Sequence, residues 1–295
     1  MTRIHPVSPP ASVVSRQRTA RALTRVLALA AFELRATLRG KMVPTFAALF
    51  AVVAAGLALA GLGGSGQLLV QGFTRTAVSL MTLGYYMMPL LGLLLGAMAF
   101  VANSAAMEAI AAQPVGITEL VVGRALGLLG AIVLVVLAGF GSAMLFIAAN
   151  AGTAGIGGFL LVALGSVLAG AAGLAVGTLL GVVSRSRLGA MGGAIAAWLF
   201  AAVVFDLIAI GALQLVGDGQ PGRWLLALLG LNPIDGLRAV SLVELGADVL
   251  LGPAGAALER MLGGAAGLTF VAVSLTLWVA VPLAAAITLS QRRDR

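Results

Sequence analysis

Six long apolar runs constrain this chain more than any other feature of its sequence. Each is about 20 residues or longer, the length a helix needs to cross the hydrocarbon core of a bilayer. Strands of a membrane barrel would instead alternate apolar and polar residues over about ten positions. Hydrophobic residues make up 61% of the 295 residues and charged residues only 9%. The sequence therefore predicts an all-α integral membrane protein with six transmembrane helices, at about 44–62, 77–100, 124–149, 159–182, 188–210 and 265–289.

The positive charges are unevenly distributed along the chain. Eight of the 18 Lys and Arg residues precede Pro44. If both termini are cytoplasmic, 14 of the 18 lie on the cytoplasmic side, as the positive-inside rule requires. The four on the other side are Arg75, Arg223, Arg238 and Arg260. We therefore expect both termini in the cytoplasm, and membrane lipids rather than nucleic acid as the partner of the basic residues.

The N-terminal region is expected to lie on the membrane surface. Residues 1–17 form a Pro- and Ser-rich tail that we predict to be disordered and cytoplasmic. Between Arg18 and Arg39, arginines recur at helical spacing, while Leu and Ala residues occupy another face. A solvated basic helix would carry fewer leucines, so the pattern favours an amphipathic interfacial helix over residues 18–43. The remaining parts are the transmembrane domain and a short cytoplasmic tail, at 44–289 and 290–295.

The sequence lacks the motifs of an enzyme. A phosphate-binding Walker loop requires a Gly-Lys-Ser/Thr element, but the only lysine, Lys41, is followed by Met42. The sequence shows no HExxH motif, no Ser/His/Asp set, no paired intramembrane carboxylates and no Cys. We therefore expect a non-enzymatic chain that holds no nucleotide, cofactor or metal ion of its own.

Two further patterns leave alternatives open. Methionines gather in the second span, where thioethers could contact a soft metal or fill gaps in the core. Glycines recur four residues apart, which lets helix backbones approach closely in lipid and suits either a sliding interface or static packing. The methionines are Met81, Met87, Met88 and Met98, and the glycine sets are Gly92 with Gly96, Gly123 with Gly127, Gly173 with Gly177 and Gly181, and Gly189 with Gly193.

Asp206 is the one ionisable residue deep in an apolar run. A charge there is costly in a bilayer, so such residues usually face a bundle interior or water. The run from Leu188 to Val216 is longer than one crossing needs. This favours a gate-like position for Asp206 near the outer interface over a site at the bilayer midplane. The outer segment 216–264 is also apolar in parts, so we expect it to rest on the membrane or dip into it.

The stretch 101–123 interrupts the apolar pattern and is predicted to be a cytoplasmic loop. It overlaps the sequence MEAIAAQPVGITELVVGR, which runs from Met107 to Arg124. Pro114 cannot continue a helix, so we expect a short helix to end before it. A new helix is expected to start with Thr118 as its N-cap and Glu119 in its first turn. The short helix could be a handle for a soluble partner or a plain connector.

Several of these stretches resemble the type-2 exporter permeases of ATP-binding cassette (ABC) transporters. AQPVGITELVVGRALG is similar to the loop that precedes the third span in that family. SLMTLGYYMMPLLGLLLG, the span-five stretch from SRSRLGAMGG onward and LLGLNPIDGLRAVSL resemble one branch, the permease of the transporter that matures nitrous oxide reductase. The likeness covers roughly residues 30–290. The family pattern E-x-E-x-GT is replaced here by Val101, Asn103, Ala105 and Ala106, which thins the charge of the loop.

The resemblance implies a transport subunit of a larger assembly in the bacterial inner membrane. Two copies of the permease would form the pathway, and a separate ABC ATPase would bind ATP and Mg²⁺ and push on a coupling helix in each copy. The residues implied at the ATPase contact are Ala105, Glu108, Ala109, Ala112 and Pro114. Those implied in the gate or pathway are Asp206, Asn232, Pro233, Asp235 and Arg238.

The resemblance also implies a cargo. The branch is expected to export a copper- or sulfur-related species for the copper–sulfide centre of nitrous oxide reductase, with a periplasmic maturation protein as a further partner. Two alternatives stay open. One is a different cargo, such as a drug, lipid or peptide, and the other is an ATP-independent carrier that uses Asp206.

Overall fold

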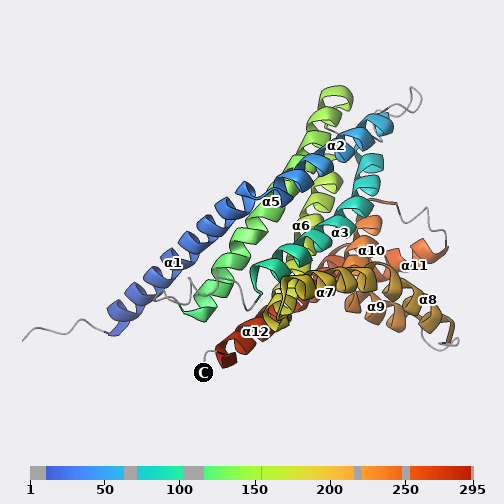
Figure 1. The fold of residues 1–295 in the computed structure, drawn as a ribbon. Helices are drawn as coiled ribbons and strands as arrows, with labels where there is room; N and C mark the ends of the chain where they lie inside the picture. Colours follow the sequence, from blue (N-terminus) through green and yellow to red (C-terminus); the bar gives the residue numbers. More distant parts are fainter. Residues whose placement is uncertain are drawn as a thin grey trace, which may run out of the picture.

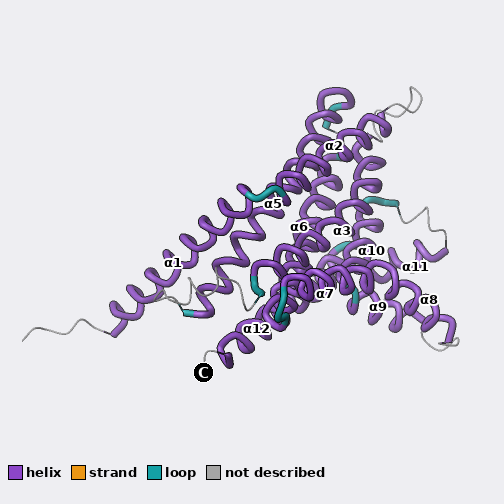
Figure 2. The backbone as a smooth tube through the Cα atoms, viewed as in Figure 1, coloured by secondary structure: helices purple, strands orange, loops and turns teal. Residues whose placement is uncertain are grey.

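The protein is built from helices alone in the part that the computed structural model describes, residues 11–62, 72–101, 116–153, 155–215, 221–247 and 253–293 (Figure 2). The helices are α1 (Ala11–Arg39), α2 (Met42–Leu62), α3 (Gly72–Ala99), α5 (Ile117–Ala151), α6 (Ile156–Val183), α7 (Arg187–Leu199), the π-helix η2 (Phe200–Val204), α8 (Phe205–Leu215), α9 (Pro221–Leu231), α10 (Pro233–Glu244), α11 (Pro253–Leu262) and α12 (Ala265–Arg293).

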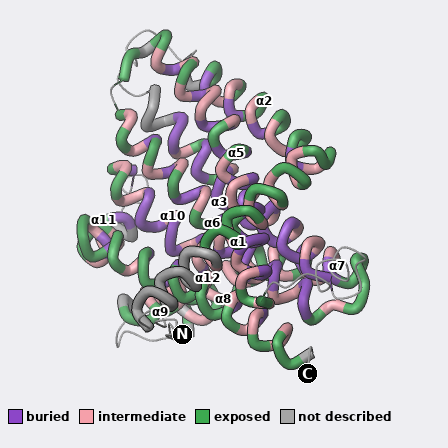
Figure 3. The backbone as a smooth tube through the Cα atoms, turned by 90° about the vertical axis from the view of Figure 1, so that its left-hand side faces the viewer, coloured by how far each residue is buried: buried purple, intermediate pink, exposed green. Residues whose placement is uncertain are grey.

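Among the residues that the structure describes, six stretches of helix are long and apolar enough to cross a membrane. They are Met42–Ala60, Thr76–Ala99, Ile117–Asn150, Ile156–Val183, Arg187–Ala212 and Ala265–Arg292. Each overlaps one of the six runs predicted from the sequence, so the predicted all-α membrane fold is confirmed. Buried residues concentrate along α3, α5 and α6 (Figure 3). Leucines on the outside, such as Leu145 at 71% exposed, suit contact with lipid.

The centre of the bundle is the pair α3 and α6, which lie side by side in Figure 1 and whose backbones touch. A Cβ atom added to Gly96 would lie 2.6 Å from the backbone oxygen of Leu174. Cβ atoms on Gly92 and Gly173 would also collide with backbone atoms of the facing helix. Only glycine leaves room for so close an approach of two helices in lipid.

The other predicted glycine sets differ in what they touch. A Cβ atom on Gly127 would lie 2.5 Å from the backbone oxygen of Ala30, so α5 approaches α1 as closely as α3 approaches α6. Gly193 has no such neighbour, because the nearest atom to its added Cβ would be Cδ2 of Leu180 at 4.0 Å. Gly189 meets only the side chain of Ser186, which caps its own helix. The glycine pattern on α7 therefore does not pack against another helix of this chain within the described ranges.

Helices α1 and α2 both pack along the length of α5, α1 at one end and α2 at the other (Figure 1). At the α2 end, the Phe50 and Phe140 rings have centroids 5.7 Å apart, and the Ser142 hydroxyl donates to the Ala51 carbonyl at 3.3 Å. The 35 residues of α5 span about 52 Å at 1.5 Å per residue, well beyond the roughly 30 Å of a bilayer core. Helix α1 lies along the N-terminal end of this long helix.

Helix α1 begins earlier than the sequence predicted. A disordered tail was expected over 1–17, but the helix includes residues from Ala11 onward. No Gly or Pro interrupts the chain from Ala11 to Arg39, and Gly40 then separates α1 from α2. The position of α1 on the membrane surface stays a prediction.

We predict that Gly96→Ala lowers the unfolding temperature of the purified protein in detergent. The added methyl group would lie 2.6 Å from backbone atoms of α6, and overpacking of this kind typically costs about 1–3 kcal/mol. Gly193→Ala is the matched control, because its methyl group would have no atom closer than 4.0 Å. Both substitutions gain the same helix propensity, so the difference between them reports the α3–α6 contact. Equal unfolding temperatures would show that the two backbones do not touch.

Candidate functional site

Two interrupted helices meet at the candidate site. The fifth span, predicted at about 188–210, is present as Arg187–Ala212, and within it the helix widens into the π-helix η2 between α7 and α8. π-helices are rare and occur often at functional sites. Close by, α9 and α10 are separated by a bend of 120°. The pair is apolar enough to enter a bilayer as a broken span or a re-entrant segment, as the sequence led us to expect for this outer region.

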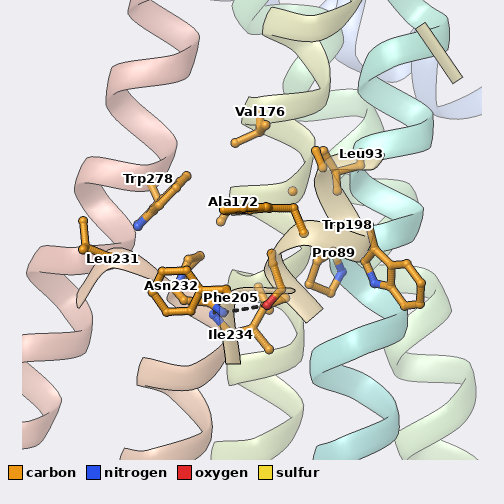
Figure 4. A pocket seen from close by; sticks show the side chains of 16 residues that line it. Pro89, Leu93, Ala172, Val176, Trp198, Phe205, Leu231, Asn232, Ile234 and Trp278 are labelled. Carbon is orange, nitrogen blue, oxygen red and sulfur yellow. Dashed lines mark hydrogen bonds between the residues drawn. The ribbon is translucent and has the colours of Figure 1, made fainter. Parts of the chain in front are cut away.

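Asn232 joins the two interruptions. Its side chain is the N-cap of α10, because its Oδ1 accepts a hydrogen bond from the Ile234 N–H at 3.1 Å. Its Nδ2 donates to the carbonyl oxygen of Ala201 in η2 at 2.7 Å (Figure 4) and to the Asp235 carboxyl at 2.6 Å. Pro233 fills the first helical position, where its missing N–H is not needed. One buried amide therefore holds η2 against the start of α10.

Asp206 and Asp235 form a pair of carboxyl groups. Asp206 lies in the first turn of α8, directly after η2, and its carboxyl group is within hydrogen-bonding reach of that of Asp235. The sequence indicated no paired carboxylates, because these two residues are 29 positions apart; the fold corrects that prediction. Two carboxyl groups therefore lie next to each other where α8 meets α10.

A cation and two tyrosines complete the site. Arg238 lies one turn after Asp235 on α10, and its Nη1 donates to the Tyr86 hydroxyl of α3 at 3.2 Å. The adjacent Tyr85 is fully buried, and its hydroxyl is hydrogen-bonded to that of Ser241 on α10 at 2.6 Å. These two hydrogen bonds fix α10 against the central helix α3.

The charged side chains share one hollow. Asp206, Asp235 and Arg238 line a space of about 300 Å³ whose other lining residues are apolar. Such surroundings weaken the screening of charge, so the attraction between the two carboxyl groups and Arg238 depends strongly on their separation. The arrangement can therefore respond to any movement that separates α8 from α10.

The structure brings together the five residues that the resemblance placed in a gate or pathway. Asp206, Asn232, Asp235 and Arg238 interact directly, and Pro233 lies between two of them. Their role as a gate stays a prediction. The sequence analysis did not assign a role to Tyr86, although this residue is part of the stretch SLMTLGYYMMPLLGLLLG. It also missed the Ala201 carbonyl, because a backbone acceptor leaves no signal in the sequence.

The loop that precedes α5 is described only at its two ends. The residues expected at an ATPase contact, Ala105, Glu108, Ala109, Ala112 and Pro114, lie outside the described residues. At the far end, α5 begins at Ile117 with Gly116 as N-cap, so the prediction of Thr118 as N-cap is wrong. No side chain caps this helix start, but Glu119 places a carboxylate in the first turn, where negative charge is favoured.

Two ion pairs tie α1 to the start of α5. Arg124 donates to Glu33 at 2.9 Å and 3.4 Å, and the two side chains are only 8% and 12% exposed. The Arg124 guanidinium also lies 5.1 Å from the ring centroid of Phe100, directly after α3. Nearer the surface, Arg25 donates to Glu119 at 2.7 Å and 2.8 Å, and these hydrogen bonds raise the pKa of the Arg25 guanidinium above its ordinary value. Arg124 therefore contacts both Phe100, at the start of the loop, and Glu33 of α1.

The methionines of the second span mostly serve packing. Met81 and Met88 are 1% or less exposed and belong to the hydrophobic core. Within the described ranges, no three His, Cys, Asp or Glu side chains gather so that they could hold a metal ion. The burial of Met81 and Met88 supports the packing interpretation for these two residues, and thioether contact with a metal stays a prediction.

Comparisons with known proteins agree on one family. Residues 27–295 match the family described as ABC-2 family transporter protein. The chain is 31% identical over 275 residues to a Pseudomonas aeruginosa protein named "Probable ABC transporter permease protein NosY", covering 91% of this chain and 98% of the relative. A protein of the same name from Stutzerimonas stutzeri is 32% identical over 227 residues, covering 75% of this chain and 82% of the relative.

We predict that Asn232→Ala destabilises the protein. The substitution leaves the Ala201 carbonyl and the Ile234 N–H without their side-chain partner, and an unsatisfied buried polar group costs about 1–3 kcal/mol. The measurement is thermal unfolding in detergent. Asn150→Ala is the matched control, because that exposed amide bonds only a carbonyl of its own helix, at 2.8 Å. If both variants unfold at the wild-type temperature, Asn232 does not hold the two interruptions together.

We also predict that Glu33→Ala is strongly destabilising. It leaves the Arg124 guanidinium buried without a counter-charge, which costs about 3–5 kcal/mol in comparable pairs. The double variant Glu33→Met/Arg124→Met should recover most of this loss, because it removes both charges together. Arg25→Ala, which breaks the exposed pair, should have little effect. The prediction fails if the Glu33 and Arg25 variants are equally stable in thermal or denaturant unfolding.

Proposed function

Because this chain belongs to the ABC-2 family of transporter proteins, we propose that it is the permease of an ATP-driven exporter and works with a separate ABC ATPase subunit. The observation that carries the proposal is the family match over residues 27–295, which includes all six apolar helices. The chain itself is a multi-pass membrane protein and a transport subunit. Its sequence has no Walker loop, so ATP and Mg²⁺ would bind to the partner.

The proposed assembly contains two copies of this permease in a bacterial inner membrane, with both termini of each copy in the cytoplasm. The excess of Lys and Arg in the segments assigned to the cytoplasm supports this orientation. In this orientation the loop 101–123 faces the ATPase, whereas Asn232 and its neighbours face the opposite side. A periplasmic maturation protein would meet the protein there.

The loop 101–123 is proposed as the point where the ATPase acts. The residues that would make the contact are Ala105, Glu108, Ala109, Ala112 and Pro114. Helix α5 starts at the end of this loop, and the pairs Arg124–Glu33 and Arg25–Glu119 fix α1 to it. A push on the loop would therefore move α1 and α5 together, along the length of the bundle.

The cluster at Asn232 is proposed as the gate. The Asn232 amide and the Asp206–Asp235 pair hold η2, α8 and α10 in one arrangement. Because α10 is also fixed to α3 through Tyr85 and Tyr86, a shift of α3 would pull on these contacts. Opening would separate α8 from α10 and expose the carboxyl pair.

The proposed cargo is a sulfur- or copper-related species for the maturation of nitrous oxide reductase. The similarity to two proteins named NosY supports it, together with the Asn232-Pro233-x-Asp235-x-x-Arg238 element. The chain has no Cys and its single histidine is His5, near the N-terminus. Of the ligands that a copper ion prefers, the six spans therefore contain thioethers but no thiolate or imidazole.

We predict that Glu108→Lys uncouples ATP hydrolysis from transport. Reversal of the charge would place a cation where the loop meets the ATPase and weaken the contact. The measurement is ATP hydrolysis together with transport in proteoliposomes. The complex that contains the Glu108 variant is compared with the wild-type complex. Glu259→Lys is the control, because it makes the same change on an exposed position of α11. Normal coupling in the Glu108 variant would remove the loop from the ATPase contact.

The cargo is tested by deletion of the protein in a denitrifying host. Nitrous oxide reductase from the deletion strain should lack its copper–sulfide centre, as read from the visible absorption of the purified enzyme, and Asp206→Asn should give a partial loss. Normal maturation in the deletion strain would reject this cargo while leaving the permease assignment intact. Proton-driven flux without any ATPase would instead establish the carrier alternative.

A further inference from the structure

A second cavity lies beside η2. It has a volume of about 240 Å³ and is bounded by residues of α3, α6, α7, η2, α8, α9, α10 and α12. Figure 4 shows Ala172 and Val176 on one wall, with Trp198 and Trp278 on either side and Asn232 at one end. No residue of this lining carries a charge.

The polar atoms of the lining side chains are all bonded within the protein. Trp198 Nε1 donates to the Tyr86 carbonyl at 2.8 Å, and Trp278 Nε1 donates to the Gly230 carbonyl at 3.2 Å. The Asn232 amide donates hydrogen bonds to two protein partners, and its oxygen accepts one from a third. A polar ligand would find none of these side chains free to bind it.

The chemistry of the lining selects the occupant. A buried water needs two to four hydrogen-bond partners, and an apolar cavity without them stays dry. A charged ligand would lose its hydration without compensation. An empty space of this size would forfeit dispersion contacts around its whole lining, and a cavity of about 150 Å³ is already large enough to bind benzene. The cavity therefore suits an apolar group and excludes ions.

The cavity opens to the outside of the bundle. Phe200 and Leu231 at its rim are 51% and 60% exposed, whereas Ala172 and Asn232 inside it are each 2% exposed. Phe200 and Ala172 belong to helices that are long and apolar enough to span the membrane. The apolar groups that surround such helices in a bilayer are acyl chains.

We propose that this cavity binds one acyl chain of a membrane phospholipid. The acyl chain would lie between α6 and η2 and contact Trp198 and Trp278. Ala201 both lines the cavity and accepts the hydrogen bond from Asn232. The acyl chain would therefore pack against the π-helix at the residue that Asn232 holds. This lipid site is independent of the cargo and of the ATPase.

The two tryptophans make the site measurable. The chain has three tryptophans, and the third, Trp224, is 54% exposed on α9 and does not line the cavity. The protein with Trp224→Phe therefore reports the cavity alone. It is reconstituted into vesicles of phosphatidylcholine that carries bromine atoms on one acyl chain, and tryptophan quenching is compared with that in unbrominated vesicles.

Filling the cavity should remove this quenching. In the Trp224→Phe background, Ala172→Leu should lose a large part of the quenching by brominated lipid, and Val176→Phe provides a second variant if the first does not fold. Ala272→Leu is the matched control, because it adds the same atoms to an exposed position of α12 and should keep the quenching. A reporter with Trp198→Phe/Trp278→Phe, which keeps only Trp224, should not respond to Ala172→Leu.

Equal quenching in the Ala172 and Ala272 variants would overturn the proposal, because the bromine atoms would then reach the tryptophans from bulk lipid. Absence of quenching in the starting protein would overturn it as well. The measurement requires neither an ATPase nor a cargo. A negative result would therefore leave the proposed transport function unchanged, and loss of that function would leave the lipid site unchanged.

Discussion

Backbone contact between α3 and α6 is the constraint on which the candidate site depends, because α10 and α12 are both positioned against this pair. Burial of apolar surface gives no drive for association in lipid, so helices there depend on close packing and on hydrogen bonds. Gly92, Gly96 and Gly173 allow the packing. The partners then attach to this pair from both sides, since α10 is bonded to tyrosines of α3 and α12 packs against α6.

Helix α5 plays the matching role at the other side of the bundle. It is longer than a bilayer core is thick, and α1 and α2 follow it in turn. Its N-terminal end is bound to α1 through charges, and its far end is bound to α2 through Phe50 and Phe140. Ion pairs hold α1 to α5 near the loop that precedes α5, whereas aromatic packing holds α2 to α5 farther along the helix.

The sequence was sufficient for the spans and only partly for the site. Bilayer thickness and the need to satisfy every backbone group restrict spans to long apolar helices, so hydropathy finds them. Asp206 stood out as a charge in an apolar run, and the resemblance indicated Asn232 and Asp235. The pairing of Asp206 with Asp235 was out of reach, because it depends on the 120° bend and on η2. Neither feature leaves a periodicity in the sequence.

The π-helix determines which way the side chains of α7 and α8 point relative to each other within the fifth span. Each residue of an α-helix turns the chain by about 100°, and a π-turn accommodates one residue more than an α-turn. The five residues of η2 therefore reset the rotational phase between Trp198, which faces α3, and Asp206, which faces α10. With one residue fewer, the same span would still cross the membrane, but its two functional faces would no longer point at their separate partners.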